Sequence, residues 1–350
     1  MQLIDARDPV PLHRDHVEVV VSFVEDDGHY PRAHRDDPVA AYWKAIAVMV
    51  ATLRTVGADW PVHVSTNRPP RDASVRAVLD RLGVGFRDTE FRHRPPPGWF
   101  DRFSGSFYLL DALHDAVEHA PAGARIALVD PDCVWVRHPS PLVRRLDEDP
   151  DAILAYEITY TPGQPALGLT QEQMGAFFAE IGEQPVPARP PYAGGEFLFA
   201  SRERLALLLP HVERIWSESC RRHARGDTVK ANTEEHVLTY ALGQVGWAGG
   251  TANPFMRRLW TQAPPNRNVQ GDETDLVLWH ALTEKRRGLL DLFDDVVADH
   301  PALRTPGPRY RRHLARRLWV SRGPVRRAKQ AASHRTYRLR GGQRQWPVEW

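Results

Sequence analysis

Two aspartates stand two residues apart directly after an apolar run. The run is 125–129, and Asp130 and Asp132 follow it with a proline between them. A residue before proline favours extended backbone, in which residues two apart point to the same side, so we expect the carboxylates to converge. Paired carboxylate oxygens suit Mg²⁺ or Mn²⁺, which can neutralise a diphosphate leaving group. An Asp-Pro-Asp sequence is also typical of a simple turn, and this alternative stays open.

A histidine far along the chain is the second candidate. His280 follows the apolar run 276–279 and precedes Lys285, Arg286 and Arg287. An imidazole can complete a Mn²⁺ coordination shell, and the basic trio can hold phosphates electrostatically. The alternatives are that His280 is an ordinary core or surface histidine and that the trio is a solvated helix face.

Three glutamates are candidates for proton transfer or for positioning a substrate. Glu196 follows the pair 194–195, two glycines that either form a bulge or let backbone approach a ligand closely. Glu234 lies one turn before an apolar helical stripe, where a carboxylate is costly without a partner or a task. Glu235 stands three residues after Asn232, which favours a helix-capping role for it.

The elements that must position these residues alternate in the first half of the chain. Apolar, β-branched runs predict strands over 17–24, 61–66, 84–88 and 125–129, and amphipathic patterns predict helices over 38–57, 72–82 and 103–117. This alternation predicts an α/β domain with a mostly parallel sheet, whose ligands bind at the carboxyl ends of the strands. The second half predicts strands over 151–156 and 192–200, helices over 170–182, 201–226 and 233–243, and a last strand or bend over 275–280.

Charge is distributed unevenly along the 350 residues. The chain is 42% hydrophobic and 26% charged, with a net charge of +2, an ordinary composition for a globular protein. Residues 309–350 hold 13 Lys and Arg and one acidic residue, whereas the rest of the chain holds 33 basic and 43 acidic residues. We therefore expect a domain over 1–300, and a linker followed by a basic C-terminal tail over 301–350. Such a tail suggests an anionic partner.

Some classes of protein are disfavoured by the same composition. No apolar run reaches the ~18–20 residues of a membrane-spanning helix, and the first residues lack the basic-then-apolar pattern of a secretory signal. Two cysteines, Cys133 and Cys220, make neither a disulfide framework nor a zinc cluster. We expect a cytoplasmic protein, with peripheral membrane contact through the tail as an option.

These motifs, in this order, resemble the metal-dependent nucleotide-sugar glycosyltransferases of the GT-A type, most closely glycosyltransferase family 8. The resemblance extends over residues 17–290. Asp130 and Asp132 match the Asp-x-Asp motif of the family, the strand 193–199 resembles its Asn-Ala/Ser-Gly strand, and the segment 234–239 resembles its Asp-Gln-x-x-Leu-Asn helix. His280 and Lys285 match its late His and Lys. Glu-Glu stands where the family has Asp-Gln.

The resemblance implies a GT-A (Rossmann-like) fold and transfer of a sugar from a nucleotide-diphosphate donor to an acceptor hydroxyl. The acceptor is a sugar, another small molecule or a lipid-linked molecule. Mn²⁺ or Mg²⁺ would be held by Asp130, Asp132 and His280, and the diphosphate by Lys285, with help from Arg102. One of Glu196, Glu234 and Glu235 would serve the acceptor, as general base in an inverting reaction or next to the sugar in a retaining one.

The first two strands end at residues that would contact the nucleoside under the same resemblance. These are Val24, Glu25 and Asp27 after the first strand and Asn67 after the second. A sugar-phosphate nucleotidyltransferase is the alternative enzyme, but it usually has a glycine-rich loop after the first strand, where this chain is acidic. The non-enzymatic alternative is a protein that binds an anionic membrane, or less favourably nucleic acid, through the tail, where Tyr310, Leu314 and Leu318 share a helix face. A solvated tail that packs on the acidic body is slightly favoured over both.

Overall fold

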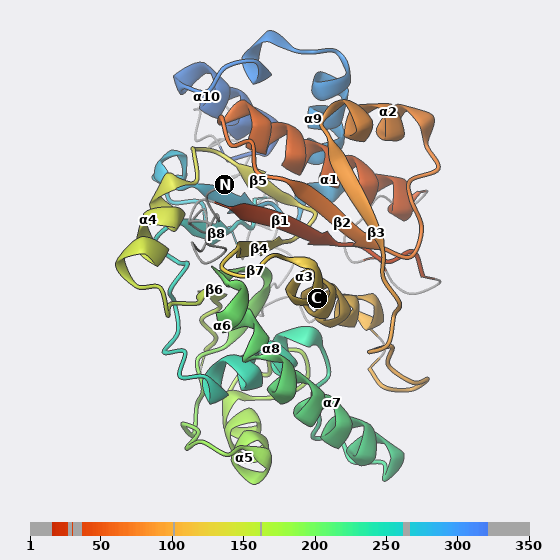
Figure 1. Ribbon diagram of the computed structural model, residues 1–350, viewed down its shortest axis with the longest axis vertical. Coiled ribbons are helices and arrows are strands. Elements are labelled where there is room, and N and C mark those ends of the chain that lie inside the picture. Colours follow the sequence, from red (N-terminus) through yellow and green to blue (C-terminus); the bar gives the residue numbers. More distant parts are fainter. Residues whose placement is uncertain are drawn as a thin grey trace, which may run out of the picture.

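The computed structural model describes residues 16–26, 30, 37–100, 102–161, 163–261 and 267–320. Its centre is a six-stranded sheet of order β3-β2-β1-β4-β7-β6, next to a three-stranded sheet of order β5-β9-β8 (Figure 1). The strands are β1 Val17–Ser22, β2 Val62–Thr66, β3 Val84–Asp88, β4 Arg125–Val129, β5 Cys133–Trp135, β6 Leu154–Glu157, β7 Ala193–Ser201, β8 Met256–Arg258 and β9 Leu278–His280.

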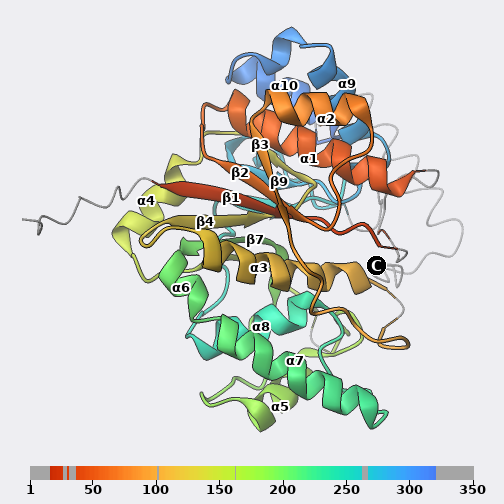
Figure 2. The same cartoon turned by 45° about the vertical axis from the view of Figure 1, so that its right-hand side comes forward.

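Helices cover both faces of the large sheet. On one side lie α1 (Pro38–Thr55), α2 (Ala73–Arg81), α9 (Gly288–Val297) and α10 (Pro308–Arg317). On the other lie α3 (Tyr108–His119), α5 (Gln171–Ile181), α6 (Arg202–Ala206), α7 (Leu209–Ala224) and α8 (Glu234–Gln244), as the two views show (Figures 1 and 2). The remaining helical elements are α4 (Ser140–Glu148) and the short 3₁₀ helices η1 (Ser104–Phe107), η2 (Glu273–Asp275), η3 (Glu284–Arg286) and η4 (Pro301–Leu303).

The sheet confirms the alternation expected from the sequence. Strands β3, β2, β1 and β4 are parallel neighbours, and β7 joins β4 and β6 in antiparallel pairs. The first helix begins as its sequence predicts, because Asp37 accepts a hydrogen bond from the Ala40 N–H at 2.9 Å and Pro38 occupies the first turn. Thr170 and Gln173 form the predicted capping box of α5. The fold is thus α/β with a mostly parallel sheet flanked by helices.

The start of the basic extension is part of this fold. The segment expected as a linker contains η4, and the Leu303 carbonyl there accepts a hydrogen bond from Thr55 Oγ1 at 2.7 Å. In and just after α10, Tyr310, Leu314 and Leu318 are fully buried, and the Tyr310 hydroxyl donates to the Trp135 carbonyl. This face is therefore not available to a membrane, and its burial agrees with the alternative that the tail packs on the body.

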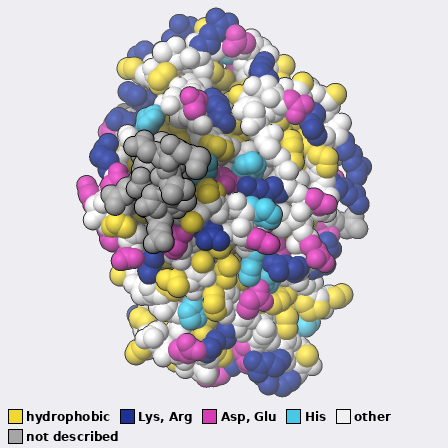
Figure 3. All heavy atoms as spheres, in the orientation of Figure 1, with side chains coloured by type: hydrophobic (Ala, Val, Ile, Leu, Met, Phe, Trp, Pro, Cys, Tyr) yellow, Lys and Arg dark blue, Asp and Glu magenta, His cyan; other side chains and the backbone are white. Residues whose placement is uncertain are grey.

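The rest of the extension lies outside the described residues, from 321 to 350. Among the helices that the structure does describe, none is long and apolar enough to cross a bilayer. The surface seen in Figure 3 has Lys and Arg side chains interspersed with Asp and Glu side chains.

We predict that Leu314→Ala destabilises the protein by about 2–5 kcal/mol, because it leaves a cavity between α10 and the body. Chemical unfolding of the full chain, followed by circular dichroism, measures this. Arg312→Ala on the exposed face of α10 is the matched control and should change the free energy of unfolding little. Equal stability of the two variants would mean that α10 is not part of the cooperative fold.

Candidate active site

The Asp130–Asp132 segment forms a turn that leads from β4 into β5. The Cys133 N–H donates to the Asp130 carbonyl at 3.1 Å, and the Asp130 N–H donates to the Glu196 carbonyl of β7 at 3.0 Å. The backbone is therefore not extended as expected, and the turn alternative is correct for its shape. The carboxylates still converge, because β5 pairs with β9 and sets Cys133 opposite His280.

Asp130, Asp132 and His280 bring their ligand atoms together as the sequence predicts, with each atom within 4.8 Å of the others. His280 Nε2 lies 3.1 Å from Asp132 Oδ1 and 3.6 Å from Asp130 Oδ2. Two carboxylates and one imidazole form a donor set that fits Mn²⁺ and also accepts Mg²⁺. The side chain of Asp130 is 32% exposed and that of Asp132 is 1% exposed, so the cluster opens on one side only.

Electrostatics show that this cluster lacks positive charge. Burial raises the pKa of Asp130 to about 7; the charge of His280 opposes this shift, and the charges of Asp132 and Glu196 add to it. Burial works against the imidazolium of His280, but Asp132 and Glu196 raise its pKa to about 9. Near neutral pH the imidazole of His280 is therefore protonated and Asp130 is about half protonated. A divalent cation would replace those protons and relieve the repulsion between the carboxylates.

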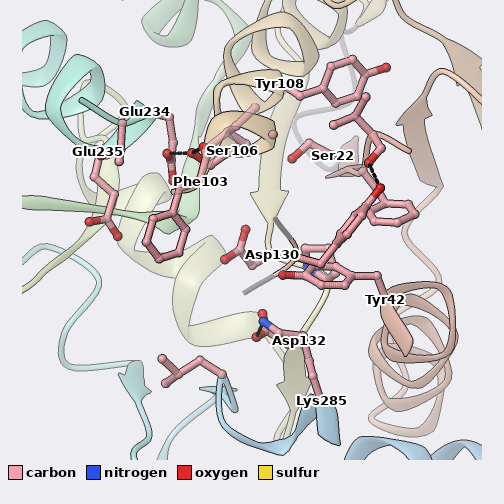
Figure 4. A pocket seen from close by; sticks show the side chains of 18 of the residues that line it. Ser22, Tyr42, Phe103, Ser106, Tyr108, Asp130, Asp132, Glu234, Glu235 and Lys285 are labelled. Atoms are coloured by element: carbon pink, nitrogen blue, oxygen red, sulfur yellow. Dashed lines mark hydrogen bonds and ion pairs between the residues drawn. The ribbon is translucent and has the colours of Figure 1, made fainter. Parts of the chain in front are cut away.

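Lys285 is the residue of the basic trio that turns into the site. It lies on η3, pairs with Asp132 and stands 4.8 Å above the centre of the Tyr42 ring (Figure 4). Burial opposes the pKa shift of Asp132, but Lys285 and His280 outweigh it and hold that pKa below its usual range. Arg286 and Arg287 are exposed, as expected of a solvated helix face.

A buried arginine that the sequence did not single out links the candidate glutamates. Arg258 of β8 donates to Glu196 Oε1 and Oε2 at 2.7 and 2.6 Å, and to Glu235 Oε1 at 2.7 Å. The Tyr192 hydroxyl donates to the other oxygen of Glu235 at 2.9 Å. Burial would raise the pKa of Glu196, but Arg258 and His280 outweigh it and lower the value to about 2. Both glutamates thus contact one guanidinium.

Two sequence expectations for these glutamates need correction. Glu235 does not cap α8 with Asn232, because both of its oxygens are taken by Arg258 and Tyr192. Glu196 is fully buried behind His280 and is absent from the described residues that line the cavity, so it positions its neighbours instead of reaching an acceptor. The sequence offered only an indirect indication of Arg258: buried glutamates require a cationic partner, but the sequence does not show which residue provides it.

Glu234 is the glutamate that faces the cavity without a cationic partner among the groups that the structure describes. Its carboxylate contacts the Ser106 hydroxyl of η1 (Figure 4). Burial, with the charges of Glu235 and Asp130, raises its pKa to about 8. The glycines of β7 make room for the acids: a Cβ on Gly195 would stand 2.9 Å from Glu234 Oε1, and one on Gly194 only 1.9 Å from Glu196 Oε2. The pairing of β6 with β7 shifts register next to these glycines, as the bulge alternative expects, and the approach of their backbone to a ligand stays a prediction.

The residues expected to contact a nucleoside divide into two groups. Val24 lines the cavity, together with its neighbour Asp26. Asn67 instead fixes the loop from behind, since its amide Oδ1 accepts from the Glu25 N–H at 2.8 Å and its Nδ2 donates to the Glu25 carbonyl at 2.9 Å. The Trp43 Nε1–H holds the Glu25 side chain at 3.2 Å.

Two further members of the expected set do not join the cavity in what the structure describes. Asp27 lies outside the described residues. Arg102 is half-buried just before η1, and the described cavity lining includes its neighbour Phe103 but not Arg102 itself.

These side chains surround one cavity of about 190 Å³ at the carboxyl ends of β1 and β4. Its lining brings together Asp130, Asp132, His280 and Lys285 on one side and Glu234, Glu235 and Ser106 on another (Figure 4). Tyr42 and Phe103 supply apolar walls. A pocket with a few converging charged groups and shifted pKa values is the usual character of a binding or catalytic site.

The fold is similar to that of the galactosyltransferase LgtC in a crystal structure with donor and acceptor sugar analogues. The TM-score is 0.50 at 13% sequence identity, and the match covers 85% of this chain and 99% of that one. This likeness confirms the expected GT-A fold. Mouse xyloside xylosyltransferase 1 (TM-score 0.46, 13% identity, 75% of this chain and 96% of that one) and the bifunctional glycosyltransferase WbbM (0.45, 11%, 88% and 53%) are more remote. No protein-family model and no curated protein matches the sequence.

We predict that Arg258→Met lowers the free energy of unfolding by about 3–5 kcal/mol, because it leaves Glu196 and Glu235 as buried, uncompensated charges. Adding Glu196→Gln to this variant should recover part of the loss, since one of those charges is then removed. Urea unfolding of the wild type, the two single variants and the double variant measures the cycle. Additive effects of the two substitutions would contradict a direct coupling of the pair.

We predict that the stability difference between Glu234→Gln and the wild type grows as pH rises. The pKa of Glu234 is raised on folding to about 8, so the folded state keeps a proton that the unfolded chain loses above its ordinary pKa. The wild type therefore loses stability between the two values, and the glutamine variant does not. At pH 8.5 the variant should gain a few kcal/mol relative to pH 5, since each pKa unit corresponds to about 1.4 kcal/mol.

Urea unfolding in EDTA at several pH values measures this difference. Glu118→Gln, at an exposed position of α3, controls for the loss of one carboxylate and should give a flat difference. A flat curve for Glu234→Gln as well would show that Glu234 is not desolvated as described.

Proposed function

We propose that this chain is a glycosyltransferase that moves a sugar from a nucleotide-diphosphate donor to an acceptor hydroxyl. The observation that carries the proposal is the convergence of Asp130, Asp132 and His280, with Lys285, at the cavity on the carboxyl edge of the sheet. The fold supports this proposal, because LgtC, whose fold is similar, has been crystallised with donor and acceptor sugar analogues.

The donor diphosphate would lie between the acidic cluster and Lys285. Asp130, Asp132 and His280 would hold Mn²⁺ or Mg²⁺, which when bound neutralises charge developing on the departing diphosphate. Lys285 is paired with Asp132 and is free to turn its ammonium group toward a phosphate once that carboxylate has another cation. Glu196 Oε1 lies 3.3 Å from His280 Nδ1. This contact orients the ring so that Nε2 faces the aspartates.

Glu234 and Glu235 stand on the side of the cavity away from Lys285 (Figure 4). Glu235 is fixed by Arg258 and Tyr192, whereas Glu234 is held by the Ser106 hydroxyl. We assign Glu234 to the acceptor hydroxyl or the anomeric centre, because it is the glutamate on the cavity wall for which the structure describes no arginine partner. Val24 and the wall formed by Tyr42 would enclose the nucleoside end of the donor.

The test is a donor screen with the full chain. Purified protein is incubated with a panel of nucleotide-diphosphate sugars, and the released nucleoside diphosphate is measured with EDTA, Mn²⁺ or Mg²⁺. We expect turnover of at least one donor that requires the added cation. We also expect Asp132→Asn to lower it by ~100-fold or more, because a ligand and the partner of Lys285 are lost together.

Asp151→Asn, at an exposed position far from the cluster, is the matched control and should keep wild-type turnover. Lys285→Ala should reduce kcat while the requirement for the cation remains. Equal turnover by Asp132→Asn and the wild type, or turnover that is the same in EDTA, would overturn the proposal. Pyrophosphate release from a nucleoside triphosphate and a sugar phosphate would instead identify a nucleotidyltransferase.

A further inference from the structure

A second group of potential metal ligands lies on the opposite flank of α3 from β1. His93 comes from the loop between β3 and η1, His114 from α3, and Glu213 from α7. Their three ligand atoms lie within 4.8 Å of one another. None of these residues lines the cavity described above, and the proposed glycosyl transfer does not use them.

The orientation of His93 is fixed by a carboxylate. Asp111 of α3 is fully buried, and its Oδ1 lies 2.6 Å from His93 Nδ1 while its Oδ2 accepts from the His93 backbone N–H at 3.1 Å. Because Asp111 receives the proton of Nδ1, a neutral His93 presents the lone pair of Nε2 to the other side. A carboxylate bonded to the far nitrogen in this way is the usual setting of a metal-binding histidine.

Glu213 then meets two imidazole nitrogens with one oxygen. Its Oε1 lies 3.1 Å from His93 Nε2 and 3.0 Å from His114 Nε2. His114 Nε2 is buried and forms no hydrogen bond with any described group, despite this short distance. Because Nδ1 of His93 donates to Asp111, Nε2 of a neutral His93 and Glu213 Oε1 are both acceptors, a contact that a cation between them would relieve.

The spacing suits a small tetrahedral cation. Bonds of about 2.0–2.1 Å from Zn²⁺ to nitrogen and oxygen put neighbouring ligand atoms of a tetrahedron about 3.3 Å apart. The observed separations of 3.0 and 3.1 Å are close to that edge. Two imidazoles and one carboxylate also form a set that prefers Zn²⁺ to the harder Mg²⁺ or Ca²⁺.

We propose that His93, His114 and Glu213 form a zinc site, with Asp111 as the positioning residue of His93. The fourth position of the ion faces solvent, since the side chain of Glu213 is 48% exposed. Arg92 lies 3.4 Å from Asp111 and partly balances that carboxylate, which keeps Asp111 as a hydrogen-bond partner and leaves ligation to Glu213.

A similar group elsewhere shows what a site without a metal looks like. Asp295, His300 and His313 also lie within ligand distance of one another. There Arg317 donates to both oxygens of Asp295 at 2.7 and 2.6 Å, and His300 Nδ1 accepts from the Ala302 N–H. The charges and lone pairs of that group are already satisfied, whereas those around Glu213 are not.

The zinc ion would tie the loop that carries His93 to α7. The same loop carries Trp99, which stacks on Trp216 of α7 with ring centres 5.3 Å apart, and leads on to Phe103 and Ser106 of the cavity. The ion would thus hold one wall of the cavity in place from outside, without touching a substrate.

The test uses the full chain without a histidine tag, stripped with EDTA and titrated with Co²⁺ as a spectroscopic probe for Zn²⁺. Tetrahedral Co²⁺ absorbs visible light much more strongly than six-coordinate Co²⁺, so the two sites are distinguishable. We expect one equivalent with the intense spectrum, displaced by Zn²⁺, and a melting temperature that rises as Zn²⁺ is added. Asp132→Ala should retain this spectrum.

Glu213→Gln and His114→Gln should each weaken Zn²⁺ binding by at least tenfold and abolish the rise in melting temperature. Both positions are at least partly exposed, and circular dichroism without metal checks that the variants fold. His119→Gln, an exposed histidine on the same helix, is the matched control and should bind as the wild type does. The proposal would be overturned if Glu213→Gln and His114→Gln each bound Zn²⁺ as tightly as the wild type. Loss of the intense spectrum in Asp132→Ala would overturn it too.

Discussion

The candidate active site depends on an imbalance of charge in a region largely closed to water. Carboxylates outnumber the cations that can reach them, and burial makes each unpaired carboxylate expensive. Arg258 forms ion pairs with Glu196 and Glu235. Lys285 and His280 form ion pairs with Asp132. Asp130 and Glu234 are left over, and both have pKa values raised by burial, to about 7 and about 8. The excess of carboxylates over cationic side chains at this site is what would attract a metal cation.

The arrangement of strands explains how this charge is gathered from distant parts of the sequence. The antiparallel pairing of β7 with β4 brings Glu196 next to the turn that follows β4. The small sheet then brings β9 and β8 across β5, which carries His280 and Arg258 to the same place. The parallel half of the fold therefore presents the cavity, and the small sheet supplies His280 and Arg258, two of the three cations in its described lining. Catalytic potential at a strand edge here comes from strand pairing more than from any local motif.

Local signals in the sequence predicted what local physics determines. Alternating apolar runs and caps such as Asp37 gave the first strands and helices, and Asp130, Asp132 and His280 were identified by residue type and position. The extended backbone predicted for Asp-Pro-Asp was wrong, because a hydrogen bond to β7 and the start of β5 determine the shape of this segment. Arg258 was missed because a buried ion pair depends on residues 23 and 62 positions away. The alternatives for the apolar face of α10 stayed open for the same reason: an amphipathic sequence shows that a helix has an apolar face, but not what covers it.

The same reasoning distinguishes, by chemistry, the metal-ligand group at the cavity from the group around Glu213. At the cavity, two carboxylates and one imidazole favour a hard cation that exchanges ligands readily, which suits an ion that must contact a substrate phosphate. Around Glu213, two imidazoles and one carboxylate, one ring being locked by Asp111, favour an ion that stays in place. The helix α3 lies between the cavity and the group around Glu213. Its Asp111 and His114 belong to the group around Glu213, and its Leu109 lines the cavity. A fixed ion on the outer flank would restrain the loop before η1, so that Ser106 keeps its contact with Glu234 while the inner cation and substrate come and go.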